Sequence, residues 1–347
     1  MRPTKRALRP FFLIGFITII VLSPLVYYHA YRENNFNIEV HPTPLVLPAQ
    51  DIPDRAHFVY VVEDEEADLV LTFSQALSVF AARYHWHPRE MFFHTNAADA
   101  TVLRARQGRA GKWSKMILDV PEMTVVRVRL PMQAANGVPI RYMEHKSDFV
   151  RVQAVRDFGG VYLDFDAHVL RDIRPLLRMG FRAVGGRQVD GLVISGTFMA
   201  SKGAKLVSRW YEEMHRVYDG AWITHSNKLI TSIGQSLVPE AGQMLILDRA
   251  ALAPGDWSKA QCTNLWQTHD PAAAPEATWL HDYSDTWILH AFSPHRFQWP
   301  IKGYSSITPR YVLANQSNFA RAVMPVARYM LEQGLVEDVH DDTERGS

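Results

Sequence analysis

The sequence has very little cysteine and no excess of either charge. Its 347 residues include one cysteine, Cys262. A single thiol excludes an internal disulfide and any zinc site built from cysteines. Lysine and arginine number 37 against 36 aspartates and glutamates, so no overall positive field attracts nucleic acid, and we expect no nucleic-acid partner. With 47% hydrophobic residues, a chain of this length can bury a core without disulfides.

One long uncharged apolar run lies near the N-terminus, at residues 11–28. The basic residues that precede it are Arg2, Lys5, Arg6 and Arg9. About 18 apolar residues are enough to cross a bilayer, and a basic flank predicts a cytosolic N-terminus. We therefore expect an uncleaved membrane anchor. The alternative is a cleaved signal peptide, which is disfavoured because residues 29–31 form a poor cleavage site.

This topology predicts a single-pass type II protein of the Golgi or the ER, with everything after residue 28 in the lumen. Three prolines between residues 42 and 48 suggest a short stem, and the last residues are acidic and polar. The expected division is a cytosolic tail (1–10), a transmembrane helix (11–28), a stem (29–50), a catalytic domain (51–300), and a C-terminal extension with an acidic tail (301–347).

Strand and helix patterns alternate after the stem. Residues 57–62, 91–94 and 125–130 are rich in β-branched and aromatic residues, which predicts strands. Residues 69–84 carry apolar side chains at helical spacing. Strand, helix and strand in succession predict an α/β sheet rather than a helical bundle or a β-sandwich.

The segment with the strongest chemical signal begins with a helix. Ser147 is a plausible N-cap, and apolar residues then recur at three-residue spacing up to Phe158. Gly159 and Gly160 should end this helix, because glycine adopts the left-handed conformation of a helix C-cap at little cost. A short buried strand at residues 161–163 follows.

Two aspartates follow that strand, on either side of Phe165. If the backbone is extended there, Asp164 and Asp166 point to the same face while Phe165 packs inward. Two carboxylates suit Mg²⁺ or Mn²⁺; a turn without a metal is the alternative interpretation. On the preceding helix Asp148 and Arg151 are three residues apart and share a face, either as ligand-binding residues or as a surface ion pair.

The segment HKSDFVRVQAVRDFGGVYLDFDAHVLRDIRPL, residues 145–176, resembles the DXD segment of glycosyltransferase family 32, whose members include fungal mannosyltransferases. Residues 52–60 and 91–96 are similar to the first two strands of that family. The resemblance implies a GT-A-like fold, in which a mixed, mainly parallel sheet flanked by helices binds a nucleotide sugar. It also implies a divalent metal and retention of anomeric configuration.

The resemblance also implies roles for individual residues. Asp166 would bind the metal directly, and Asp164 would contact the donor and support the metal, so both are candidate catalytic residues. The candidate donor-binding residues are Asp148, Arg151, Tyr162, Asp164 and Tyr60.

Members of the family tend to complete the metal site from a C-terminal loop. His290, in the run WILHAFS, is the candidate here, and His281 is the alternative. Imidazole suits Mn²⁺, although a histidine beside Leu289 and Phe292 is also typical of a hydrophobic core. The sequence departs from many relatives in having Phe165 between the aspartates and no asparagine at residues 191–197.

The resulting functional prediction is a retaining, metal-dependent hexosyltransferase, with Mn²⁺ or Mg²⁺ as cofactor. GDP-mannose is the favoured donor over a UDP-sugar, from the fungal resemblance alone. The acceptor would be a glycan or glycolipid, and a complex with other transferases is a further expectation.

Two other classes of function stay open from sequence. A DxD-type phosphatase also places its aspartates after an apolar strand, but His168 stands where that class usually carries a hydroxyl residue or valine. A non-catalytic anchored subunit of a transferase complex is the other alternative. The intact Asp148, Arg151, Asp164 and Asp166 argue against it.

Overall fold

The computed structural model of the chain describes residues 51–273, 275–292 and 299–337. The expected tail, transmembrane helix and stem lie outside these residues, as does most of the acidic tail. Within the described part, no helix is both long and apolar enough to cross a bilayer. The membrane topology and the domain boundaries therefore stay predictions.

A mixed sheet runs through the described chain, in the order β3-β2-β1-β4-β7-β6-β8. Its strands are β1 (Arg55–Val59), β2 (Glu90–Thr95), β3 (Met123–Arg127), β4 (Gly160–Leu163), β6 (Ala183–Arg187), β7 (Val193–Ala200) and β8 (Leu245–Leu247). Strand β7 is antiparallel to both of its neighbours, and the remaining pairs are parallel. The expected mixed, mainly parallel α/β sheet is confirmed.

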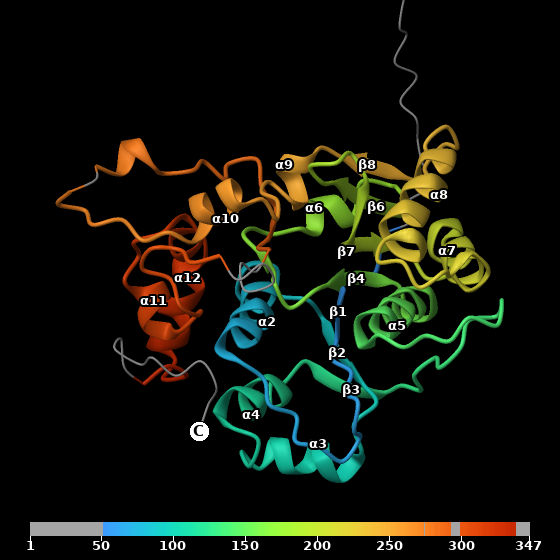
Figure 1. The fold of residues 1–347 in the computed structure, drawn as a ribbon, viewed down its shortest axis with the longest axis horizontal. Helices are drawn as coiled ribbons and strands as arrows, with labels where there is room; N and C mark the ends of the chain where they lie inside the picture. Colours follow the sequence, from blue (N-terminus) through green and yellow to red (C-terminus); the bar gives the residue numbers. More distant parts are fainter. Residues whose placement is uncertain (1–50, 274, 293–298, 338–347) are drawn as a thin grey trace, which may run out of the picture. The chain divides into compact units, whose positions relative to one another are not determined.

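Helices cover both faces of this sheet (Figure 1). One apolar core lies beneath α2 (Phe73–His85), α4 (Lys112–Leu118) and α12 (Asn318–Glu332), and a second beneath α5 (Met143–Phe158), α7 (Lys205–Val217) and α8 (Leu229–Leu237). The other helices are α3 (Asp99–Arg106), α6 (Arg174–Leu177), the π-helix η1 (Thr224–Lys228), α9 (Arg249–Leu252), α10 (Lys259–Trp266), the 3-10 helix η2 (Glu276–Thr278) and α11 (Pro309–Leu313).

The predicted strands and the helix over residues 69–84 exist with shifted ends. Strand β1 ends at Val59 rather than at residue 62, and β3 covers 123–127 rather than 125–130. Helix α2 begins at Phe73, because the Thr72 side chain accepts a hydrogen bond from the Gln75 backbone and the Gln75 side chain accepts one from the Thr72 backbone.

The expected N-cap at Ser147 is wrong. Helix α5 begins one turn earlier, at Met143, and the Lys146 amide already bonds to the Tyr142 carbonyl at 3.1 Å. Tyr142, the actual N-cap, makes no side-chain capping bond, so burial of the first turn decides where the helix starts: His145 and Lys146 are both buried.

The expected end of this helix at the two glycines is confirmed. Gly159 is the C-cap, with φ at +67°. A side chain at Gly160 would place its Cβ 2.6 Å from the Arg55 carbonyl oxygen on the neighbouring strand β1. The glycine pair therefore both ends the helix and lets strand β4 enter the middle of the sheet beside β1.

A two-stranded antiparallel sheet joins the centre of the chain to its C-terminal part. Strand β5 (Ala167–Val169) pairs with β9 (Ile288–His290), and Ala167 lies opposite His290. The Ala291 amide also bonds to the Asp166 carbonyl at 2.8 Å. This pairing brings His290 next to the two aspartates, from more than a hundred residues away in sequence.

Candidate active site

The two aspartates lie in a turn rather than on an extended strand. Strand β4 ends at Leu163, and the Ala167 amide bonds to the Asp164 carbonyl at 2.9 Å, which closes the turn. The expected extended backbone is therefore wrong, although the turn still aims both carboxylates at one point. Phe165 packs inward as expected, with its ring 5.3 Å from that of Phe58.

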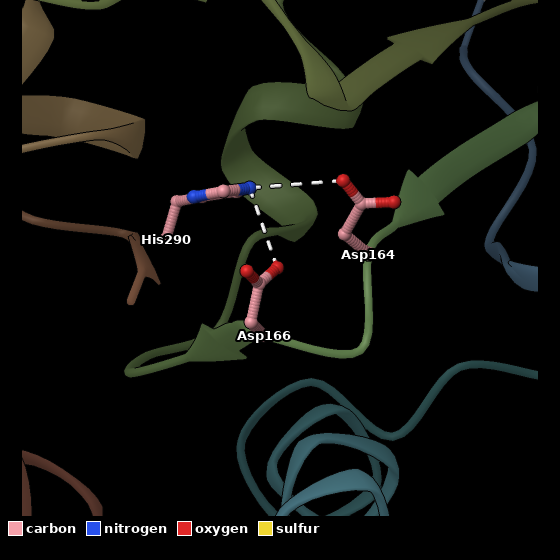
Figure 2. Close-up of side chains that lie close together, drawn as sticks. All are labelled: Asp164, Asp166 and His290. Atoms are coloured by element: carbon pink, nitrogen blue, oxygen red, sulfur yellow. Dashed lines mark ion pairs between the residues drawn. The ribbon is translucent and has the colours of Figure 1, made fainter. Parts of the chain in front are cut away.

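His290 completes a cluster with Asp164 and Asp166 (Figure 2). Its Nε2 lies 3.4 Å from Asp166 Oδ1 and 3.7 Å from Asp164 Oδ2. Neither ring nitrogen of His290 has a hydrogen-bond partner among the described residues. Because ligands at right angles on an ion with bonds of about 2.1 Å lie about 3 Å apart, the spacing suits a shared cation.

Strand β7, which faces the cluster, has no side chain at the point of contact. A Cβ at Gly196 would lie 2.5 Å from Asp164 Oδ2 and 2.6 Å from His290 Nε2. The Gly196 carbonyl accepts a hydrogen bond from the Asp164 amide at 2.8 Å, which fixes the turn against β7. Glycine at this position therefore keeps the space beside Asp164 and His290 open.

The charges in the cluster shift one another's pKa values. Burial alone would raise the pKa of Asp164, but Arg151 and His290 outweigh it and lower the pKa. Burial raises the pKa of Asp166, and the neighbouring Asp164 adds to the rise. Burial would lower the pKa of His290, yet Asp166 and Asp164 raise it. The cluster thus concentrates negative charge that a cation can neutralise.

Arg151 connects the cluster of Asp164, Asp166 and His290 to helix α5. It bonds to Asp148 at 3.0 Å, to Asp164 at 3.4 Å and to the Ser195 carbonyl oxygen at 3.2 Å. Burial alone would lower its pKa, but Asp164 and the other acidic groups hold the pKa well above its usual value. Asp148 and Arg151 are each 8% exposed, so the interpretation as a surface ion pair is wrong.

The two candidate tyrosines occupy different surroundings. Tyr162 is 1% exposed; its hydroxyl donates to Asp164 Oδ1, and the Arg151 guanidinium lies 4.8 Å above its ring. Tyr60 is half-buried at the end of β1, with its ring 6.1 Å from that of Phe165 on the aspartate turn. Tyr162 therefore belongs to the charged network, whereas Tyr60 packs on the apolar side of the turn.

The structure also places residues that sequence reasoning missed. His225 Nε2 lies 2.8 Å from Asp148 Oδ2, and Asn227 accepts a hydrogen bond from Ser195. No local pattern marks these residues, which are 77 and 32 positions away from their partners. His281, the alternative metal ligand, does not join the cluster of described side chains and packs against Tyr283 instead.

Comparisons with known proteins concern the same segment. Residues 64–181 match the family described as the glycosyltransferase sugar-binding region containing the DXD motif. The match includes Asp148, Arg151, Asp164 and Asp166 and excludes His290. The chain is 21% identical to Glucan organizing enzyme 1 of Cryptococcus neoformans var. grubii over 286 residues, which cover 79% of this chain and 70% of that protein.

Two solved structures share parts of the arrangement at low similarity. The apo form of the glycosyltransferase GlyE from Streptococcus pneumoniae TIGR4 has a TM-score of 0.44 at 11% identity, covering 84% of this chain and 65% of that one. The bifunctional protein WbbM has a TM-score of 0.46 at 10% identity, covering 83% of this chain and 52% of that one. The chain thus spans roughly half to two thirds of their lengths.

Proposed function

We propose that the chain is a DXD-type glycosyltransferase, like the family that residues 64–181 match. It would transfer a hexose from a nucleotide sugar to a glycan or glycolipid acceptor, with retention of configuration and with help from a divalent metal. The observation that carries this proposal is the convergence of Asp164, Asp166 and His290 beside the buried Asp148–Arg151 pair. The match of residues 64–181 to a glycosyltransferase family favours this function over the DxD phosphatase, and the intact site favours an active enzyme over a non-catalytic subunit.

The residues present fit a divalent cation. Two carboxylates and one imidazole would hold it, a donor set that suits Mn²⁺ and, with more water ligands, Mg²⁺. Gly196 leaves room at the centre of the cluster, and His290 Nε2 has no other described partner. Once bound, such an ion would supply positive charge where the diphosphate leaves.

The protein's own residues would orient the donor. The Arg151 charge is already shared between two carboxylates and a carbonyl, so this residue holds Asp148 and Asp164 in place. Asp148 would accept hydrogen bonds from sugar hydroxyls beside it.

The finer assignments rest on resemblance. GDP-mannose as donor follows from the similarity to fungal mannosyltransferases. A polysaccharide acceptor agrees with the name of the fungal relative, a glucan organizing enzyme. The predicted anchor at residues 11–28 would place the site in the Golgi or ER lumen, and a complex with other transferases there is part of the proposal.

Nucleotide binding tests the proposal. The purified protein is titrated calorimetrically with GDP and with UDP, each with and without Mn²⁺. We expect binding of one nucleotide, GDP, that requires the metal, and hydrolysis or transfer from the matching sugar nucleotide. Failure of both nucleotides to bind in the presence of Mn²⁺ would refute the metal-dependent mechanism, and UDP binding alone would reassign the donor.

A further inference from the structure

The π-helix η1 packs beside the Asp148–Arg151 pair. π-helices are rare and are frequently found at functional sites. Two of its side chains reach toward the pair: His225 bonds to Asp148 directly, and Asn227 accepts from Ser195, whose carbonyl oxygen accepts from Arg151. Asn227 in turn donates to Gln188 at 3.2 Å.

The imidazole of His225 is fully buried and tightly enclosed. Its ring stacks on that of Phe149 at 5.7 Å with an interplanar angle of 14°, and the rings of His145 and Tyr218 contact it at 4.6 and 5.0 Å. The Trp210 indole donates to the His225 carbonyl oxygen at 2.8 Å, which anchors the backbone of the π-helix. The side chain therefore has little freedom to rotate.

Within this enclosure the ring has one polar contact. Its Nδ1 has no partner among the described residues, and its Nε2 lies 2.8 Å from Asp148 Oδ2. Because a carboxylate oxygen accepts, Nε2 carries the proton and donates. Asp148 is thus held by His225 on one oxygen and by Arg151 on the other, since Arg151 reaches Oδ1 at 3.0 Å.

We propose that His225 is a positioning residue, which orients Asp148 for the transferred sugar. It also keeps Asp148 and Arg151 aligned with the turn at residues 164–167, which carries the two aspartates. The proposal rests on the proposed function, because it assumes that Asp148 holds the donor sugar. A buried, enclosed donor with Asp148 as its polar partner suits this role, since it leaves the carboxylate a single orientation. Without that bond, only Arg151 would hold the Asp148 carboxylate, through Oδ1, and the position of Oδ2 would no longer be fixed.

Substitutions that keep or remove the donated hydrogen bond test the role. His225→Gln places an N–H near the position of Nε2, whereas His225→Phe keeps the stacking on Phe149 and donates nothing. A hydrogen bond to a charged group stabilises by about 1.5–3 kcal/mol, or roughly 10- to 100-fold in binding. We expect His225→Phe to raise the donor KM or lower kcat/KM for the donor by that factor with the acceptor KM unchanged, and His225→Gln to recover most of the loss.

The coupling with Asp148 separates positioning from mere packing. In an Asp148→Ala background, His225→Phe should cause no further loss in kcat/KM, because its effect passes through Asp148. His215→Phe is the control, since His215 also packs on Phe149, at 4.6 Å, but bonds to no site residue; it should keep full activity. If His225→Phe does not fold, His225→Asn, which is too short to reach Asp148, replaces it.

Two outcomes would overturn the proposal: a His225→Phe enzyme with wild-type donor kinetics, or the same fold-loss with and without Asp148. A wild-type protein that neither binds nor uses a nucleotide sugar would instead refute the proposed function itself, and the two failures are therefore distinguishable.

Discussion

At Gly196 the addition of a single methyl group should damage the proposed metal site. A methyl group there would lie 2.5 Å from Asp164 Oδ2 and 2.6 Å from His290 Nε2, much closer than van der Waals contact. Both side chains are constrained: Arg151 and Tyr162 hold Asp164, and the pairing of β5 with β9 holds His290. Alanine must therefore push two proposed metal ligands apart.

Gly196→Ala should reduce metal-dependent binding more than it reduces the stability of the fold. Overpacking of this kind typically destabilises by about 1–3 kcal/mol, which a domain of this size tolerates. A displacement of about 1 Å in a catalytic group can reduce the rate about 100-fold. We therefore expect Gly196→Ala to fold, with a modest drop in melting temperature, and to lose at least about 10-fold in Mn²⁺-dependent nucleotide affinity and about 100-fold in transfer.

Calorimetry with Mn²⁺ and nucleotide, paired with thermal unfolding, measures both quantities. Gly234→Ala is the matched control, because its Cβ would make ordinary contacts with the side chains of Met244, at 3.4 Å, and Ile246, at 3.7 Å, and alanine is favoured in helix α8. A Gly196→Ala protein with wild-type metal-dependent binding would refute the argument that the three side chains share one ion at this point.

Three further predictions concern the turn that carries the two aspartates, Arg151, and two buried histidines of the sheet. Asp166→Ala should abolish metal-dependent nucleotide binding with the fold intact by circular dichroism, whereas Phe165→Ala should mainly lower the free energy of unfolding, by about 2–4 kcal/mol; the reverse pattern would contradict the roles assigned to the turn. Arg151→Lys should reduce kcat/KM at least about 10-fold, because lysine cannot bridge two carboxylates and a carbonyl as the guanidinium does; steady-state kinetics near wild type would disprove this. Burial lowers the pKa of His57 to about 4 and of His94 to about 3, against about 6.5 when unfolded, so the unfolded chain binds more protons below pH 6.5. Stability should consequently fall from about pH 6.5 toward about pH 4, by up to about 1.4 kcal/mol per pH unit for each histidine, and urea midpoints that do not change between about pH 7 and about pH 5 would contradict the sign.

Local features of the sequence specify more of this site than of the surrounding fold. The spacing of Asp148 and Arg151 on one helix makes them neighbours, and the glycine pair predicts where that helix ends. Both follow from interactions within a few residues, which the local sequence encodes. The prediction of an N-cap at Ser147 was wrong for the same reason, because it considered only local interactions. A good capping residue does not begin a helix where packing of the preceding turn favours an earlier start.

The relation between distant segments depends on long-range packing. The sequence suggested His290 as a ligand only by resemblance, and its place beside Asp166 depends on the pairing of β5 with β9. No sequence pattern marks His225 or Gly196 as a site residue. The role of each depends on the distant side chains that it contacts in the folded chain. The linear order of residues was enough to predict the available chemistry, two neighbouring carboxylates and a charged pair on a helix. Contacts between segments far apart in the chain, which no local pattern encodes, place these groups face to face, add the two imidazoles, and leave the space for an ion.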